Sequence, residues 1–307
     1  AAHAKELSYA HYSQPTHELH WSVAEKFAAD VARVTNNEVT IKVYASGELG
    51  AGPTQQYKRA LDGVADITQG LIGSDAIPMP RTSLMELPGL FDGPKDAVET
   101  LWANKELFAD DFKRVELLAA FPNSPAIILS NKKITSPEDM KGLNIRASSG
   151  VAAAFVEELG ATPVTMPAGD LYNALQTGVI DGALIGSDGA KAYRLNEVSK
   201  YALDGLPTMM TFFYVIANGD SYQSLSDEQR AKIAEVAGKT LSDSGREGFE
   251  KSSQAAYEAM AASKVEISKP ADPAAFEAAA KTVREKFAAE HGAKHSIDAS
   301  AILNAVK

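Results

Sequence analysis

The chain has 307 residues, which favours two domains at roughly 150 residues per domain. With 45% hydrophobic and 23% charged residues, its composition is that of a globular protein and excludes a disordered, collagen-like or repeat-array chain. The formal net charge of -10 argues against a nucleic-acid-binding protein, which needs clustered Lys and Arg, and the absence of Cys excludes disulfides and thiolate nucleophiles.

In the first hundred residues, strand and helix patterns alternate. A strand is predicted over residues 7–10, an amphipathic helix over 15–36, a second strand over 39–44 and a helix that begins at Pro53 and ends at Leu61. Strands that alternate with helices predict a largely parallel sheet.

A second set of the same signals begins near residue 125. A short apolar strand is predicted over residues 127–130, a helix start at Ser136 with Pro at its first position, and a strand over 143–147. Residues 60–66 and 174–181 also resemble each other, because each segment ends a helix at Gly before another strand. This echo indicates two lobes of similar α/β construction.

The last third of the sequence predicts a strand over residues 212–217 and a long helix. Ser226 opens a capping box, and the helical pattern extends past Ala255 with Gly238, Gly245 and Gly248 as its only interruptions. Such a helix is long enough to brace two lobes.

The predicted fold is therefore α/β and two-lobed, with a hinge and a long bracing C-terminal helix. The first lobe is expected to comprise residues 1–124 and about 213–250, and the second residues 125–212 and about 251–307. The extended stretches 121–126 and 209–213 are the expected hinges, and a cleft between α/β lobes is a preferred ligand site.

Enzyme and metal signatures are largely missing from the sequence. There is no G-x-S-x-G elbow, P-loop or G-x-G-x-x-G motif. His17 and His20, like His291 and His295, lack a third metal ligand and are interpreted as surface or capping residues. We therefore expect no cofactor, no metal and no catalytic residue.

Arg146 is the residue whose position best indicates binding chemistry. It ends a predicted strand on the face opposite Ile145, at a carboxyl end where α/β sheets bind ligands. Its guanidinium is a rigid, two-pronged donor that matches a carboxylate. From the residues alone, an ordinary surface arginine is the alternative.

Several segments together resemble one known family. The sequence is similar to the solute-binding receptors of tripartite ATP-independent periplasmic (TRAP) transporters, of the C4-dicarboxylate-receptor (DctP) type. The most specific resemblances are the segment S-P-E-D-M-K-G-L-N-I-R at 136–146 and the segment D-L-Y-N-A-L-Q-T-G-V-I-D-G at 170–182. The L-P-G-L-F turn at 87–91 and the opening strand and helix add to them.

This resemblance implies a periplasmic receptor with a two-lobed, periplasmic-binding-protein-like fold. Such a receptor closes its lobes on a small organic acid and delivers it to membrane permease subunits without altering it. Ala2-His3-Ala4 fits the pattern at a signal-peptide cleavage site, so we expect that a signal peptide has been removed. No apolar run is long enough for stable membrane insertion of this chain. The resemblance also places Arg146 at the carboxylate clamp and Asp170 near the cleft, with a helix cap as the alternative role of Asp170.

Departures from the family pattern narrow the class of ligand that we expect. Ala126 replaces a second cleft arginine, Ala168 an aromatic residue, and Ile185 an asparagine. A second carboxylate would lack a counter-charge, so a monocarboxylate is favoured over a dicarboxylate.

Further candidate ligand contacts follow from strand ends and hinges. They are His11, Tyr12, Ser13, Ser74, Phe121, Asn123, Ser187 and Phe212. Ser187 is expected to cap a helix whose N-terminus faces an anion. The alternative function is a two-lobed α/β enzyme that acts on a carboxylic acid in the same cleft, for which no base and nucleophile pair is evident. A scaffold protein without a ligand is the third possibility.

Overall fold

The computed structural model describes residues 4–307, and the segment Ala2-His3-Ala4 therefore lies largely outside the described residues. The chain forms two compact units. Unit 1 consists of Ala1–Met79, Val98–Pro122 and Phe212–Gly248, and unit 2 of Pro80–Ala97, Asn123–Thr211 and Phe249–Lys307. The boundaries differ from the expected ones in that residues 80–97 belong to unit 2.

Hydrogen bonds explain why residues 80–97 belong to unit 2. The Gly89 N–H donates to the Thr208 carbonyl at 2.8 Å. Arg284 donates from Nη1 to the Pro88 carbonyl, also at 2.8 Å. The segment is thus held by parts of unit 2 that follow it by more than a hundred residues in the sequence.

Unit 1 is built on a five-stranded sheet with the order β2-β1-β3-β10-β4. Strands β1, β2 and β3 are parallel, and β10 runs antiparallel to both β3 and β4. The strands are β1 (Lys5–Ala10), β2 (Val39–Tyr44), β3 (Ile67–Leu71), β4 (Val115–Pro122) and β10 (Phe212–Asn218).

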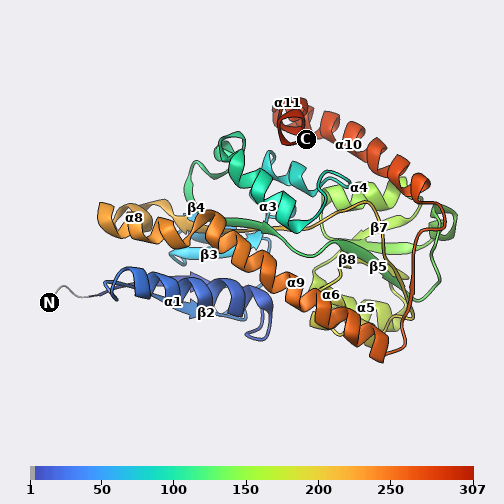
Figure 1. Ribbon diagram of the computed structural model, residues 1–307, viewed down its shortest axis with the longest axis horizontal. Helices are drawn as coiled ribbons and strands as arrows, with labels where there is room; N and C mark the ends of the chain where they lie inside the picture. The colour runs from blue at the N-terminus through green and yellow to red at the C-terminus, as the bar shows by residue number, and fades with distance from the viewer. Residues whose placement is uncertain (1–3) are drawn as a thin grey trace. The chain divides into compact units, whose positions relative to one another are not determined.

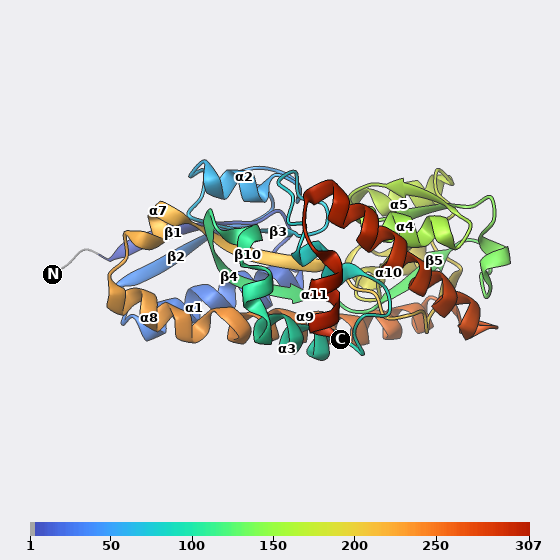
Figure 2. The same ribbon diagram turned by 90° about the horizontal axis from the view of Figure 1, so that it is seen from above.

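Helices cover both faces of this sheet. Helix α2 lies on one side, and α1 and α8 lie together on the other (Figure 2). Leu19, Val23, Phe27 and Val31 recur every four residues and are all buried; this stripe seats α1 and the π-helical turn before it. The helices are α1 (Glu25–Val34), α2 (Gln56–Leu61), α7 (Gly219–Gln223) and α8 (Asp227–Val236).

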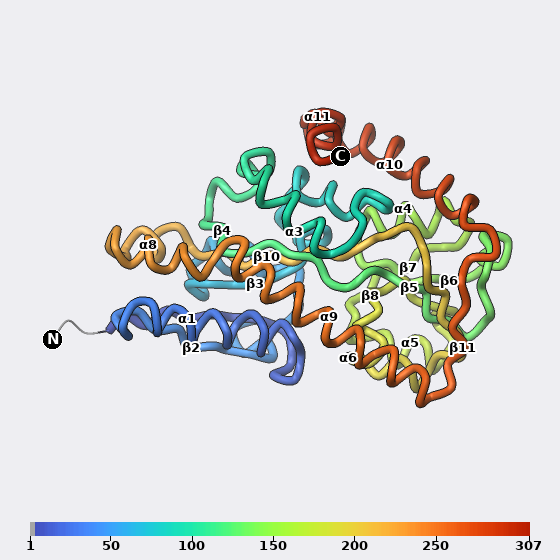
Figure 3. Tube along the Cα trace, in the orientation of Figure 1, coloured from blue at the N-terminus to red at the C-terminus, as the bar shows by residue number. Residues whose placement is uncertain are grey.

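Unit 2 contains a six-stranded sheet with the order β11-β9-β5-β8-β6-β7, and the trace can be followed in Figure 3. Strands β6, β7 and β8 are parallel, whereas β5 runs antiparallel to its neighbours β8 and β9. The strands are β5 (Ala126–Ser130), β6 (Asn144–Ala147), β7 (Thr162–Thr165), β8 (Gly182–Gly186), β9 (Tyr201–Leu203) and β11 (Glu266–Ser268).

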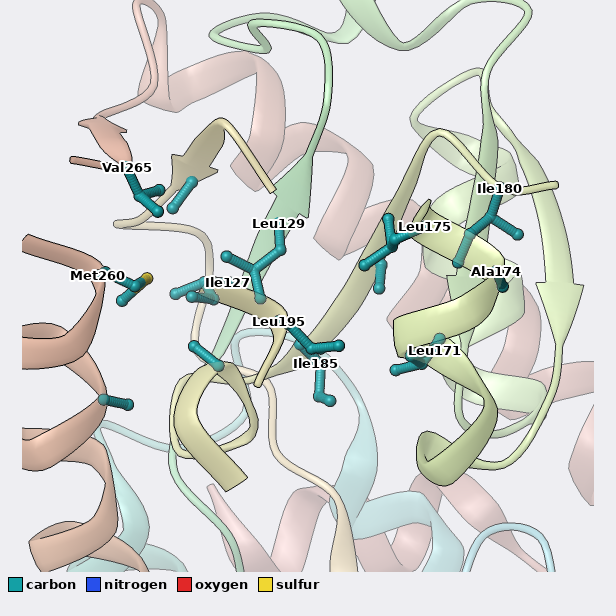
Figure 4. Close-up of a cluster of buried hydrophobic side chains, with 14 residues drawn as sticks. Ile127, Leu129, Leu171, Ala174, Leu175, Ile180, Ile185, Leu195, Met260 and Val265 are labelled. Carbon is teal, nitrogen blue, oxygen red and sulfur yellow. The ribbon is translucent and has the colours of Figure 1, made fainter. Parts of the chain in front are cut away.

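A hydrophobic cluster fills the space between this sheet and its helices on one face (Figure 4). Ile127 and Leu129 of β5 and Ile185 of β8 meet Leu171 and Leu175 there. On the other face, α4 packs against α10 (Figure 1). The helices are α4 (Gly150–Glu158), α5 (Leu171–Thr177), α6 (Gly189–Ala192), α10 (Pro273–His295) and α11 (Ala299–Val306).

Each sheet has one reversed strand, and both reversed strands have the same origin. The chain leaves unit 1 at the end of β4 and starts β5 a few residues later, and it leaves unit 2 directly before β10. A strand that starts at the carboxyl edge of a sheet must run against its neighbours. The expected parallel sheets are thus correct apart from β5 and β10.

The echo in the sequence corresponds to a repeated turn. Gly63 and Gly178 both have positive φ after a helix, and an aspartate follows shortly before the next strand. Asp66 Oδ2 accepts the Ser8 N–H of β1 at 2.8 Å, and Asp181 Oδ2 accepts the Asn144 N–H of β6 at 2.8 Å. In both units the aspartate fixes the parallel strand beside it.

Two predicted helix starts are placed too early. The helix expected from residue 15 begins near Leu19, because the His17 imidazole accepts the Leu19 N–H at 3.1 Å. The helix expected at Pro53 is α2, which begins at Gln56.

Two other helices end earlier than predicted. Ser136 forms its capping box, but only a short 3-10 turn follows over Pro137–Met140. The long C-terminal helix is divided into α8 and α9 (Gly238–Ala262), because Ala237 is extended and Gly238 has a φ of 61°.

Gly245 and Gly248 do not interrupt α9 as expected. A Cβ at Gly245 would lie 2.6 Å from the Phe121 ring, and one at Gly248 would lie 2.2 Å from Ser22 Oγ. These glycines allow close packing within unit 1. Residues 238–248 of α9 belong to unit 1 and residues 249–262 to unit 2. Helix α3 (Pro94–Ala103) is likewise divided between the two units.

Candidate functional site

The carboxyl edge of the unit 2 sheet gathers several of the predicted site residues. Strands β6 and β8 end at this edge, and β5 starts there because it runs in the opposite direction. Arg146 lies in β6, Ser187 directly follows β8, and Asn123 precedes β5. The sheet topology therefore brings together residues from three separate parts of the sequence.

Arg146 is buried within unit 2, with 5% of its surface exposed. Its Nε donates to the Met166 carbonyl at 3.0 Å, and its Nη1 contacts the Leu184 carbonyl at 3.4 Å. Among residues 4–307 no carboxylate lies within ion-pair distance of this guanidinium, and Nη2 makes no hydrogen bond there.

Burial has an electrostatic consequence for Arg146. Desolvation lowers its pKa from the usual 12.5 to about 10, an effect that Tyr193 partly opposes. The side chain therefore still carries its positive charge at neutral pH. A buried cation whose protein partners are neutral carbonyls is a strong site for an anion, and Nη2 is the atom best placed to donate to it.

A small hollow adjoins Arg146 at the same edge. Leu184, whose carbonyl accepts from Arg146, lines it, and so do Ser148 and Thr211. Ala126 and Ile185, the positions at which the sequence departs from the family pattern, also line it. No Lys, Arg or His is among its lining residues.

Asn123 has a structural role beside this hollow. Its N–H donates to the Thr211 carbonyl, and the Thr211 N–H donates to Asn123 Oδ1, both at 2.9 Å. The expected hinge segments are thus paired to each other inside unit 2. Contact of Asn123 with a ligand stays a prediction.

Ser187 does not occupy the cap position that the sequence suggested, whereas Asp170 occupies one without a capping hydrogen bond. Asp188 rather than Ser187 occupies the cap position of α6, and Ser187 Oγ lies 2.5 Å from Ser253 Oγ of α9. Asp170 precedes α5, but it is exposed and its side chain accepts no capping hydrogen bond. Ligand contacts of both residues stay predictions.

The remaining candidates lie at the carboxyl edge of the unit 1 sheet. His11, Tyr12 and Ser13 follow β1, and Ser74 follows β3, where it is half-buried. Because β1 and β3 are parallel, their ends share this edge. Tyr12 is half-buried as well.

His11 is buried and neutral. Its Nδ1 accepts the Ser13 N–H at 3.2 Å, so its Nε2 carries the proton and donates to His20 Nδ1 at 2.9 Å. Burial, aided by the nearby His20 and His17, lowers the pKa of His11 to about 4. Within unit 1, His11 therefore serves to hold the end of β1.

Phe121 and Phe212 are fully buried in unit 1. The Phe121 ring stacks on Phe213 with 5.9 Å between centroids, and Phe212 pairs with Pro122 across β10 and β4. Both have packing roles in this structure, and their contact with a ligand stays a prediction.

The histidine pairs have structural partners. In residues 4–307 no group of three or more His, Asp or Glu side chains is arranged to hold a metal ion. His291 does not lie on a solvated helix face as expected. It is half-buried, stacks on Phe287 and contacts the Pro80 carbonyl through Nε2 at 2.8 Å.

Sequence analysis missed the residues that line the hollow beside Arg146, notably Thr211, Met209 and Met210. Their position at the end of an expected hinge segment was the only signal. Within the described part of the chain, none of the helices has the length and apolar character to cross a membrane.

The fold has two α/β units, and a buried arginine without a carboxylate partner lies at one sheet edge. These features are typical of a ligand-binding protein of two α/β units. Comparison with known proteins identifies the family. Residues 9–291 match the model of the bacterial extracellular solute-binding proteins, family 7 (DctP). The chain belongs to this family, and the expected resemblance, fold class and extracytoplasmic location are thereby confirmed.

Individual proteins support this assignment. A solute-binding protein of Chromohalobacter salexigens is 26% identical over 272 residues, which cover 87% of this chain and 80% of that protein. A TRAP solute-binding protein from a marine metagenome, specific for aromatic acids and crystallised with 3-hydroxybenzoate, has a TM-score of 0.90 at 24% identity and covers 99% of this chain and 97% of its own. The structure of a TRAP periplasmic solute-binding protein of C. salexigens with bound D-glucuronate has a TM-score of 0.85 at 24% identity and covers 98% of this chain and 100% of its own.

Proposed function

We propose that this chain captures a small organic monocarboxylate through Arg146 and delivers it to the permease subunits of a TRAP transporter. One observation carries the proposal: the Arg146 guanidinium is buried, and among residues 4–307 its hydrogen-bond partners are carbonyls and not carboxylates. A buried charge without a counter-ion is costly, and a ligand carboxylate would supply that counter-ion.

The lining of the hollow favours a single carboxylate. It includes no Lys, Arg or His, and Ala126 and Ile185 contribute apolar surface to it. A second carboxylate buried there would lack a cationic partner, which costs several kcal/mol. The ligands named for the two structural neighbours, 3-hydroxybenzoate and D-glucuronate, each have one carboxylate and at least one hydroxyl.

Capture by closure of the two units is part of this proposal. If the ligand stabilises one arrangement of the units over others, ligand binding shifts the population toward it. Small-angle X-ray scattering with and without ligand measures this change.

The proposal also holds that the chain does not transform its ligand. The family consists of solute-binding proteins, and among the described residues Arg146 itself bonds only to backbone carbonyls. A product formed during incubation with bound acids would favour the enzyme alternative.

Calorimetry with a panel of acids tests the proposal. The panel contains benzoate, mandelate, glucuronate, succinate and malate, and ectoine serves as a zwitterionic member. We expect at least one monocarboxylate to bind with micromolar or better affinity, about 8 kcal/mol or more, and the dicarboxylates to bind more weakly. Binding of the dicarboxylates alone, or of none of these acids with no rise in melting temperature, would contradict the proposal.

A further inference from the structure

Two hydroxyl groups face each other in the hollow beside Arg146. Ser148 Oγ and Thr211 Oγ1 lie 3.2 Å apart, and both side chains are half-buried. In such a pair one hydroxyl donates to the other, which leaves one O–H group and several lone pairs available to a third partner. We call this pair and the space beside it the hydroxyl niche.

The backbone holds the niche in place. Thr211 is fixed by its two hydrogen bonds to Asn123, which involve only its backbone N–H and carbonyl. Ser148 directly follows β6 and precedes Ser149, whose side chain accepts the Ala152 N–H at the start of α4. The threonine side chain can therefore be changed without removal of these contacts.

The size of the hollow limits what the niche can hold. The hollow has room for about one water-sized group beside its walls. Met209, Met210 and Leu184 contribute apolar surface to its lining, and the buried Glu86 also lines it. One water molecule or one hydroxyl group fits both the volume and the available hydrogen bonds.

The niche also lies close to the anion site along the chain. Ser148 is two residues beyond Arg146, and the Leu184 carbonyl that accepts from Arg146 Nη1 belongs to a residue of the niche wall. Under the proposed function, a ligand whose carboxylate contacts Arg146 extends its remaining atoms toward this end of β6.

We propose that the hydroxyl niche of Ser148 and Thr211 binds a hydroxyl group of the ligand, so that the receptor selects hydroxylated monocarboxylates over their unsubstituted parents. This inference rests on the proposed function and sharpens it. A ligand hydroxyl replaces a water in the niche and keeps its hydrogen bonds, whereas an unsubstituted acid leaves the niche to water.

The experiment uses two pairs of acids that differ by one hydroxyl group: benzoate with 3-hydroxybenzoate, and phenylacetate with mandelate. The two pairs place the hydroxyl at different distances from the carboxylate. In calorimetry on the full chain, we expect at least one hydroxylated acid to bind about fivefold more tightly than its parent, the effect of one hydrogen bond.

Thr211→Val and Ser148→Ala should each weaken binding of the hydroxylated acid and so reduce this preference to less than about twofold. Thr177→Val is the matched control, because Thr177 is an exposed residue of α5 that bonds only to its own helix, and it should keep the preference. Ser148→Ala provides the test if Thr211→Val lowers the melting temperature strongly.

Equal affinities of the unmodified protein for the two acids of each pair would overturn the proposed role of the niche. A preference for the hydroxylated acid that survives both substitutions would overturn it as well. Either result leaves the proposed function intact as long as an acid of the wider panel binds. Failure of all four acids to bind also overturns the niche, and only failure of the whole panel removes the proposed function with it.

Discussion

Two buried arginines of this protein have opposite surroundings. Arg246 of α9 in unit 1 is 7% exposed, and its Nε and Nη2 lie 3.3 and 3.2 Å from the carboxylates of Asp243 and Glu247. Arg146 in unit 2 is 5% exposed and bonds to two backbone carbonyls. The two side chains are almost equally buried, but within residues 4–307 only Arg246 of the two has carboxylate partners.

On this difference we interpret Arg246 as a structural charge and propose Arg146 as a binding charge. The acids beside Arg246 are supplied by its own helix, so its charge is balanced whether or not a ligand is present. The charge of Arg146 is balanced only by carbonyl dipoles, which leaves a larger gain in free energy for an incoming anion. Substitutions at the two sites should therefore affect different measurements.

The largest expected effect is that of Arg146→Ala on ligand affinity. It removes the positive partner of the ligand carboxylate, so the dissociation constant should rise at least 30-fold, about 2 kcal/mol. Calorimetry with the tightest acid of the panel measures it. The melting temperature of the ligand-free variant should change little, because loss of two carbonyl bonds is offset by removal of a desolvated charge. An unchanged affinity would remove Arg146 from the site.

Arg246→Ala should show the opposite pattern. Loss of the guanidinium leaves Asp243 and Glu247 without this partner, and the free energy of unfolding should fall by about 1 to 2 kcal/mol. Urea unfolding measures this fall, and calorimetry should find the dissociation constant changed less than threefold. If Arg246→Ala weakened binding as much as Arg146→Ala, the division between the two arginines would be wrong.

His11 is a third buried basic side chain. It differs from the two arginines because it is uncharged at neutral pH. Its folded-state pKa of about 4 lies below the ordinary value of 6.5, so the unfolded chain binds the proton more readily. Stability should be constant above pH 7 and fall as the pH decreases toward 4, by about 1 kcal/mol between pH 7 and 5.5. His11→Gln retains a donor and an acceptor but not the titration.

The measurement is urea unfolding of both proteins at several pH values. His11→Gln should lose less stability than the unmodified protein over the same range of pH. Parallel curves for the two proteins would mean that His11 is not the buried neutral group described here.

The sequence predicts the local patterns of this fold better than the boundaries of its elements and units. The echo of residues 60–66 and 174–181 indicated two similar units, and the structure explains it through Asp66 and Asp181, which each fix a neighbouring strand. The assignment of residues 80–97 to unit 2 depends on contacts with Thr208 and Arg284. Contacts at such separation leave no periodic signal in the segment itself.

The same distinction applies to the site. Arg146 could be singled out because its signal is local: a charged residue at the end of a strand. Thr211 could not be singled out, because its proposed role depends on Ser148. The two hydroxyl oxygens lie 3.2 Å apart, but the residues belong to different parts of the sequence. The sequence around Ser187 predicts a helix cap. Its actual partner, Ser253 in α9, cannot be inferred from neighbouring residues.

The most direct measurement is a crystal structure of the protein with its tightest acid. The account predicts the ligand carboxylate within hydrogen-bond distance of Arg146 Nη2, with the carbonyl contacts of Met166 and Leu184 retained. A bound acid whose carboxylate lies away from Arg146, with this guanidinium still bonded only to carbonyls, would contradict it.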